Sequence, residues 1–195
     1  MNEQIFEAIV TTQSSAGQAH VAPMGVRYQH GGVIALLPFK PSATLDNIVA
    51  TRHAVLNIVT DTRVFAGCVT GRRAWPTRAA ERIAGVRLSC ALRHIELQLL
   101  EHRDDPQRPL LRMAPVHEAV HAPFDGFNRA QAAVIEGAVL ISRLRLLAAD
   151  KVDAEMNYLQ IAIDKTAGPH EREAWQWLRE ALATHRAGAA KETTP

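Results

Sequence analysis

The hydrophobic period of this sequence changes once, and that change constrains the fold more than any other feature. Up to about residue 122, apolar residues mostly recur at every second position, as they do in strands. From about residue 127 they recur at spacings of three and four, as they do in helices. The pattern predicts an α+β chain with a β domain over 1–122, a small helical domain over 123–190 and a disordered tail over 191–195.

The first half contains about six runs with strand character. They cover residues 5–12, 18–28, 33–39, 53–60, 88–103 and 109–119. Six antiparallel strands are enough to close a small barrel. Residues 61–87 are mixed in character and predict a loop that holds one short helix.

The second half predicts three helices. The first covers about 128–148 and is apolar nearly all round, which indicates burial on most sides. The second starts near Asp150, which we expect to cap it, and ends at Gly168. The third starts at Pro169. The fold class is therefore a six-stranded antiparallel barrel followed by a small three-helix domain.

Charge and composition exclude several classes of protein. A formal net charge of +2 gives no case for nucleic-acid binding. No run reaches the roughly 18 apolar residues of a membrane helix. The N-terminus lacks the features of a signal peptide, and the two cysteines form no CxxC pair, so we expect a cytoplasmic location.

The segment 39–60 carries the strongest chemical signal. A short helix is predicted over about 43–52, with Ser42 as its N-cap. Lys40, Ser42, Thr44 and Asn47 gather at its start, where free N–H groups and the helix dipole favour an anion such as phosphate. The alternative is plain capping by Ser42 with the other side chains in solvent.

The same segment resembles flavin reductase-like proteins of the FMN-binding split-barrel superfamily. Those proteins carry a Ser/Thr-rich loop, a short helix with an Asn, and a following strand that matches Asn57-Ile58-Val59. From about residue 4 to 182 the chain also looks like a functionally unassigned family of archaea and methylotrophic bacteria. The further matching motifs are 9–12, 22–26, 65–66, 127–130 and 165–168.

The resemblance implies FMN at the interface of a homodimer, with its phosphate near 42–47. Met24, Gly25 and Val26 would lie along the isoalloxazine, where a glycine backbone can approach a flat ring. A bulge at Gly25 is the alternative. Arg27 would pair with the phosphate or with reduced flavin, or would be a surface arginine.

Two further polar pairs have open roles. Asn128 and Arg129 precede the first helix of the second half and would reach the flavin or, in the better interpretation for Asn128, cap that helix. Arg72 and Arg73 are either a phosphate-binding pair or part of a solvated loop.

The function expected from the resemblance is FMN binding in support of a redox reaction, with an unknown electron donor. No general acid or base stands out, which suits chemistry carried by a cofactor. A non-enzymatic flavin carrier, or a scaffold whose helices recruit a partner, fits equally well. Family context suggests a link to one-carbon metabolism with tetrahydromethanopterin.

Residues 117–121, HEAVH, match the zinc-hydrolase motif H-E-x-x-H, with His117 and His121 as ligands and Glu118 as base. The motif needs a helix, and Pro115 and Pro123 leave too little room for one. In a strand, His117 and Val120 face opposite sides. We therefore expect no metal site.

Overall fold

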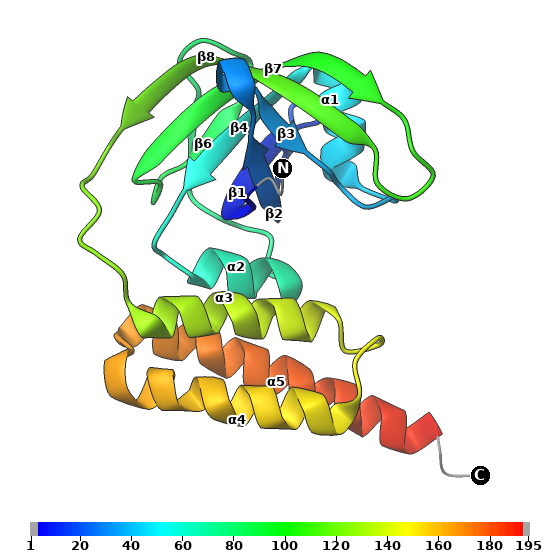
Figure 1. The fold of residues 1–195 in the computed structure, drawn as a ribbon, viewed down its shortest axis with the longest axis vertical. Coiled ribbons are helices and arrows are strands. Elements are labelled where there is room, and N and C mark those ends of the chain that lie inside the picture. The colour runs from blue at the N-terminus through cyan, green and yellow to red at the C-terminus, as the bar shows by residue number, and fades with distance from the viewer. Residues whose placement is uncertain (1–3, 193–195) are drawn as a thin grey trace. The chain divides into compact units, whose positions relative to one another are not determined.

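The computed structural model describes residues 4–192, and side chains up to residue 188. It divides the chain into two compact units, shown in Figure 1. One unit comprises the chain up to Thr60 together with Arg73–Phe124, and the other comprises Asp61–Arg72 and the chain from Asp125 onward. Among the described residues, no helix is both long and apolar enough to cross a membrane.

The first unit is a closed six-stranded barrel, as predicted. Its strand order is β1-β2-β3-β8-β7-β4, and every pairing is antiparallel. The strands are β1 (Phe6–Gln13), β2 (Ala19–Tyr28), β3 (Ile34–Leu36), β4 (His53–Ile58), β7 (Arg93–Arg103) and β8 (Leu110–Val120). Closure leaves no edge strand unpaired along the barrel wall.

The barrel core follows from side-chain alternation along the strands. Residues of one parity point inward and form a single apolar cluster. Its fully buried members include Val10, Val26, Leu36, Leu56, Ile95 and Leu111. Helix α1 (Ala43–Thr51) adds Leu45 and Ile48 to this cluster. A 3-10 turn, η1 (His30–Gly32), connects β2 to β3.

Residues 61–87 differ from the prediction of a loop with one helix. The helix exists as α2 (Arg63–Val69), but a hairpin of β5 (Thr77–Ala79) and β6 (Val86–Leu88) follows it. Both strands are three residues long, too short to show a period of two. Tertiary contacts hold β6 in place: it packs against β1 and β4.

The second unit consists of α2 with α3 (Arg129–Ser142), α4 (Ala149–Thr166) and α5 (Pro169–Glu192). Helix α2 packs on both α3 and α5, so the three C-terminal helices predicted from sequence gain a fourth from the middle of the chain. Helix α5 continues to Glu192, and residues 193–195 of the expected tail lie outside the described residues.

Two helix boundaries differ from expectation. Helix α3 ends at Ser142, six residues earlier than predicted, and turns at 143–147 let α4 fold back against it. Helix α4 begins at Ala149, so Asp150 lies in its first turn and is not its N-cap. A carboxylate there still interacts favourably with the helix dipole.

Candidate functional site

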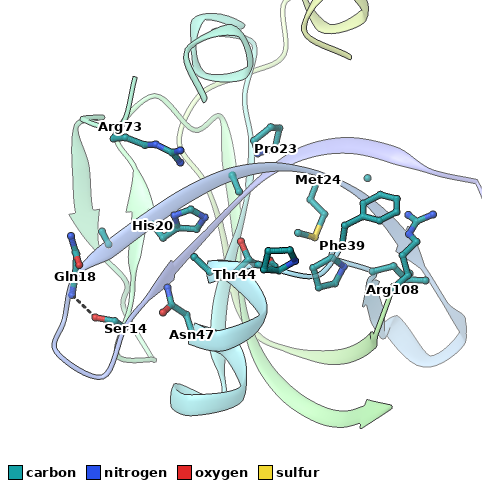
Figure 2. A pocket seen from close by; sticks show the side chains of 18 residues that line it. Ser14, Gln18, His20, Pro23, Met24, Phe39, Thr44, Asn47, Arg73 and Arg108 are labelled. Atoms are coloured by element: carbon teal, nitrogen blue, oxygen red, sulfur yellow. Dashed lines mark hydrogen bonds between the residues drawn. The ribbon is translucent and has the colours of Figure 1, made fainter. Parts of the chain in front are cut away.

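A cleft of about 800 Å³ opens between the β1–β2 hairpin, the loop after β3 and the start of α1. Figure 2 shows the side chains that line it. The volume lies within the range of cofactor and ligand sites, roughly 300–1,000 Å³. All lining residues belong to the barrel unit.

Helix α1 presents its N-terminus to this cleft. Ser42 caps the helix by accepting a hydrogen bond from the Leu45 N–H at 3.2 Å, as predicted. The N–H groups of Ala43 and Thr44 have no partner inside the helix, by helix geometry. Ser42, Ala43, Thr44 and Asn47 all line the cleft. Ser42 therefore caps the helix, but the other part of that alternative, with Thr44 and Asn47 in solvent, is wrong: Thr44 is buried and Asn47 is bonded to Thr12.

Thr44 and Asn47 are held firmly. Thr44 is only 1% exposed. The Asn47 side-chain amide donates to Thr12 Oγ1 at 3.0 Å, which ties α1 to β1. These two side chains therefore offer polar atoms at fixed positions, as a preorganised binding site requires.

The predicted ring-contacting residues of β2 divide between the cleft and the core. Met24 and Gly25 line the cleft. The side chain of Val26 is fully buried in the barrel core, because strand alternation turns it inward. Gly25 pairs with Glu7 in a regular register, so no bulge is present there. A Cβ at Gly25 would lie 2.7 Å from Ile5 Cγ2, so this glycine makes room for a neighbouring side chain.

Arg27 and Lys40 do not line the cleft. Arg27 is part of β2 and pairs with Ala35 of β3. Lys40 forms an ion pair with Asp104, with 2.5 Å between Nζ and Oδ1. An expected contact of either residue with a cleft ligand therefore requires a rearrangement or a second chain.

The cleft is also lined by three basic side chains: His20, Arg73 and Arg108. The sequence left the role of Arg73 open and gave no signal for the other two. Arg73 and Arg108 lie toward opposite ends of the view in Figure 2. The guanidinium of Arg108 stacks 4.4 Å above the Phe39 ring. No sequence spacing relates these residues, because the fold brings them from three separate segments.

The predicted pair Arg72-Arg73 divides between the two units. Arg73 faces the cleft of the barrel unit. Arg72 stacks 4.1 Å above the Trp177 ring within the helical unit. The two side chains therefore have different neighbours: Arg73 lines the cleft, and Arg72 stacks on Trp177.

His20 is biased toward its neutral form. Burial, and then the positive charge of Arg73, lower the pKa of His20 below its ordinary value of 6.5. A neutral imidazole has one donor and one acceptor nitrogen, so His20 can both donate a hydrogen bond to a cleft ligand and accept one from it.

Two residues of the resembled motifs have structural roles. Asn57 is fully buried and links β1, β4 and β6: its amide donates to Thr11 Oγ1, and its oxygen accepts from the Leu88 N–H at 2.7 Å. Asn128 caps α3, as expected, by accepting from the Ala130 N–H at 2.8 Å. Its amide also donates to the Thr166 carbonyl of α4.

The H-E-x-x-H segment lies at the end of strand β8, not in a helix. Glu118 forms an ion pair with Arg93, and 2.6 Å separates the two groups. The helical arrangement of a zinc hydrolase is therefore not formed. The rings of His117 and His121 nevertheless both lie close to the ring of His94, with centroid distances of 5.8 and 5.0 Å. The prediction from the strand pattern missed this cluster of three histidines.

Comparison with solved structures gives a match over nearly the whole chain. An FMN-bound protein from Methanosarcina mazei has a TM-score of 0.80 at 21% identity, covering 93% of this chain and 96% of that one. A 2-nitrobenzoate 2-nitroreductase from Pseudomonas fluorescens has a TM-score of 0.53 at 20% identity, covering 62% and 66%. A flavoredoxin from Methanosarcina acetivorans has a TM-score of 0.51 at 11% identity, covering 62% and 74%.

These structural likenesses establish the fold. No curated protein sequence matches the chain. The family described as protein of unknown function DUF447 matches in both of its parts, the N-terminal domain over residues 6–122 and the C-terminal part over residues 128–180. The two parts together span most of the chain, and the chain therefore belongs to the DUF447 family.

Proposed function

We propose that this protein binds FMN in the cleft beside α1 and uses it in a redox reaction. The observation that carries the proposal is the meeting of a helix N-terminus, the fixed polar side chains Thr44 and Asn47, and apolar walls in one cleft of about 800 Å³. The match over 93% of the chain to an FMN-bound protein supports the choice of ligand.

The start of α1 is the proposed phosphate site. Ser42, Thr44 and Asn47 supply side-chain donors, and the N–H groups of Ala43 and Thr44 add backbone donors. The positive end of the helix dipole favours the dianion. Arg73 or Arg108 adds a full positive charge at the cleft. Lys40 and Arg27 stay predictions, since each must leave its present position to take part.

The walls of the cleft suit a flat aromatic ring. Pro23, Met24 and Phe39 supply apolar surface, whereas the space beside the Gly25 Cα is taken by Ile5. Val26 would contribute through its backbone only, because its side chain fills the core.

When bound, FMN supplies the hydride or electron transfer, and the protein binds and orients it. His20 is the cleft histidine, and burial and Arg73 lower its pKa, so its neutral ring can accept a hydrogen bond from a bound group. The homodimer, the cytoplasmic location and the one-carbon link stay predictions.

The test is the absorption spectrum of the full-length protein from 300 to 600 nm, before and after incubation with excess FMN and desalting. We expect flavin bands that correspond to about one FMN per chain. Thr44→Val and Asn47→Leu remove polar atoms without reducing side-chain volume and should weaken FMN binding at least tenfold. Thr77→Val, at an exposed position of the β5–β6 hairpin, is the matched control and should bind FMN normally. Colourless protein after reconstitution would disprove the proposal.

Two further measurements separate the remaining alternatives. Oxidation of NADH or NADPH by the FMN-loaded protein, with free FMN as control, distinguishes an enzyme from a flavin carrier. Lys40→Ala tests the predicted contact of that lysine with phosphate: unchanged FMN affinity would assign Lys40 to its ion pair with Asp104. Native mass spectrometry of the same sample measures whether FMN binding accompanies dimer formation.

A further inference from the structure

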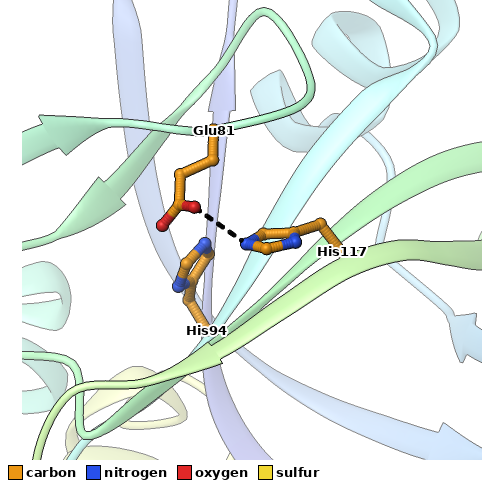
Figure 3. Close-up of side chains that lie close together, drawn as sticks. All are labelled: Glu81, His94 and His117. Carbon is orange, nitrogen blue, oxygen red and sulfur yellow. Dashed lines mark ion pairs between the residues drawn. The ribbon is translucent and has the colours of Figure 1, made fainter.

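A second cluster of titratable side chains lies on the outer face of β7 and β8 (Figure 3). Ile95 and Leu97 of β7 point into the barrel core, so His94 and Glu96 point outward. His117 of β8 is paired with Glu96 in the register and shares this face. None of these residues lines the proposed FMN cleft.

Three of the side chains converge. Glu81, from the turn between β5 and β6, approaches His94 and His117 so closely that one ligand atom of each lies within 4.8 Å of the others. Figure 3 shows both imidazoles and the carboxylate directed toward one another. The separation between Glu81 Oε2 and His117 Nε2 is 3.1 Å.

Glu96 positions the turn that carries Glu81. Its fully buried carboxylate accepts hydrogen bonds from the N–H groups of Glu81, Arg82 and Ile83 at 2.5, 2.8 and 3.0 Å. The β5–β6 turn is therefore held against the barrel wall, which fixes the Glu81 backbone beside the two imidazoles.

His94 is oriented from both sides. Its side chain is fully buried, with Nδ1 2.8 Å from His121 Nε2 and Nε2 3.2 Å from Glu96 Oε1. A neutral imidazole carries one proton. With no metal bound, Nε2 donates to the Glu96 carboxylate and Nδ1 accepts from His121. A metal bound at Nε2 would displace that proton, and Nδ1 would then carry the proton and donate to His121. A histidine that binds a metal characteristically uses its other nitrogen for such a hydrogen bond.

An ion pair between Glu81 and a protonated His117 is the simpler explanation of their contact. It does not account for the rest of the cluster. His117 Nε2 is buried, and it forms no hydrogen bond among the described residues in spite of its 3.1 Å approach to Glu81. The ion pair also does not explain why the buried ring of His94 is directed at the contact between Glu81 and His117.

We propose that Glu81, His94 and His117 bind one divalent transition-metal ion, for which zinc is the best match. Two imidazoles and a carboxylate are a frequent zinc ligand set. Tetrahedral zinc with bonds of about 2.0–2.1 Å places its ligand atoms about 3.3 Å apart. The 3.1 Å between Glu81 and His117 already lies near this value, and the other separations, all within 4.8 Å, would have to close by at most about 1.5 Å. The ion would fasten the β5–β6 turn to the barrel and keep one coordination position open.

This assignment differs from the zinc-hydrolase interpretation of residues 117–121. Glu118 pairs with Arg93 and takes no part. His121 supports His94 from behind and is not a ligand. The ligands come from three separate segments, which explains why no sequence motif predicts the site and why the sequence alone led us to expect no metal.

The test uses the full-length protein, treated with a chelator, desalted and titrated with zinc chloride in a calorimeter at pH 7.5. We expect one saturable site per chain. His117→Gln and Glu81→Gln should each weaken zinc binding at least tenfold, and both positions are accessible enough for the variants to fold. His102→Gln and Glu118→Gln are the matched controls and should bind zinc within twofold of the original protein.

Hydrogen exchange of residues 80–85 gives a second readout, because the ion would slow exchange in the β5–β6 turn. This slowing should be absent in His117→Gln. The proposal is overturned if the protein has no saturable zinc site, or if His117→Gln binds zinc as tightly as the original protein. Loss of binding in Glu118→Gln comparable to that in His117→Gln would overturn it too. FMN content, read from the spectrum of the same sample, is a separate result.

Discussion

Replacing Asn57 by Ala should destabilise the barrel far more than its position at a strand end suggests. The side chain is fully buried, and its oxygen accepts the Leu88 N–H of β6 at 2.7 Å. Its amide nitrogen lies 3.1–3.2 Å from three acceptors, the Ile9 carbonyl, Thr11 Oγ1 and the Val55 carbonyl, which share its two N–H hydrogens. One side chain thus joins three strands.

The cost of Asn57→Ala can be worked out from these contacts. Leaving the buried Leu88 N–H without a partner costs about 1–3 kcal/mol. Losing the donated hydrogen bonds costs about 1 kcal/mol more. A cavity of roughly 30 Å³ adds about 0.7 kcal/mol. We expect a total of about 3–5 kcal/mol, a large part of the 5–15 kcal/mol that stabilises a typical domain.

Native-state hydrogen exchange read by mass spectrometry is the assay, because it separates barrel peptides from helical ones. Exchange through global opening of the barrel, followed in β4, should accelerate at least a hundredfold, since 1.4 kcal/mol corresponds to a factor of ten. Asn47→Ala is the matched control. Its single side-chain hydrogen bond, to Thr12, predicts a loss below about 1 kcal/mol together with weaker FMN binding. A loss below about 1 kcal/mol in Asn57→Ala would refute the reasoning.

Three further predictions concern the helical unit and the cleft. In Gly137→Ala, the new Cβ would lie 2.7 Å from Trp175 and 3.0 Å from Leu178. Overpacking should cost about 3 kcal/mol, whereas the higher helix propensity of Ala should gain about 1 kcal/mol. Thermal unfolding should therefore show a net loss of stability of about 2 kcal/mol. A stabilised variant would mean that the Trp175 ring moves freely. Arg73→Gln should raise the pKa of His20 toward 6.5 but not up to it, because burial lowers this pKa more than the charge of Arg73 does. NMR titration of the His20 ring proton measures the pKa. An unchanged value would contradict the assigned charge effect. His20 binds its proton less tightly in the folded protein than in the unfolded chain. Its contribution to folding stability should therefore decline as the pH falls below 6.5. In Arg73→Gln this decline should be less steep.

The sequence by itself determined the elements whose stabilising interactions are local. Apolar and β-branched runs, some of them alternating, predicted the six barrel strands, and the capping residues Ser42 and Asn128 marked the starts of α1 and α3. Such signals can be read from the sequence because a strand or helix several residues long repeats its hydrophobic pattern within a few positions. Family motifs added the likeness to FMN-binding split barrels.

Only the tertiary structure decided which residues meet. The three-residue strands β5 and β6 carry no period, and they form because the barrel wall and the Glu96 carboxylate hold them. Helix α2 joined the C-terminal helices through packing, although the sequence places it between barrel strands. Long-range contacts of this kind override weak local preferences.

The two candidate sites show the same division. Ser42, Thr44 and Asn47 lie within one turn and a half of helix, so their convergence was visible in the sequence. His20, Arg73 and Arg108 converge on the same cleft from distant segments, as Glu81, His94 and His117 do on the outer barrel face. Spacing along the chain carries no information about such groups, because strand register and barrel closure alone set the distances between them.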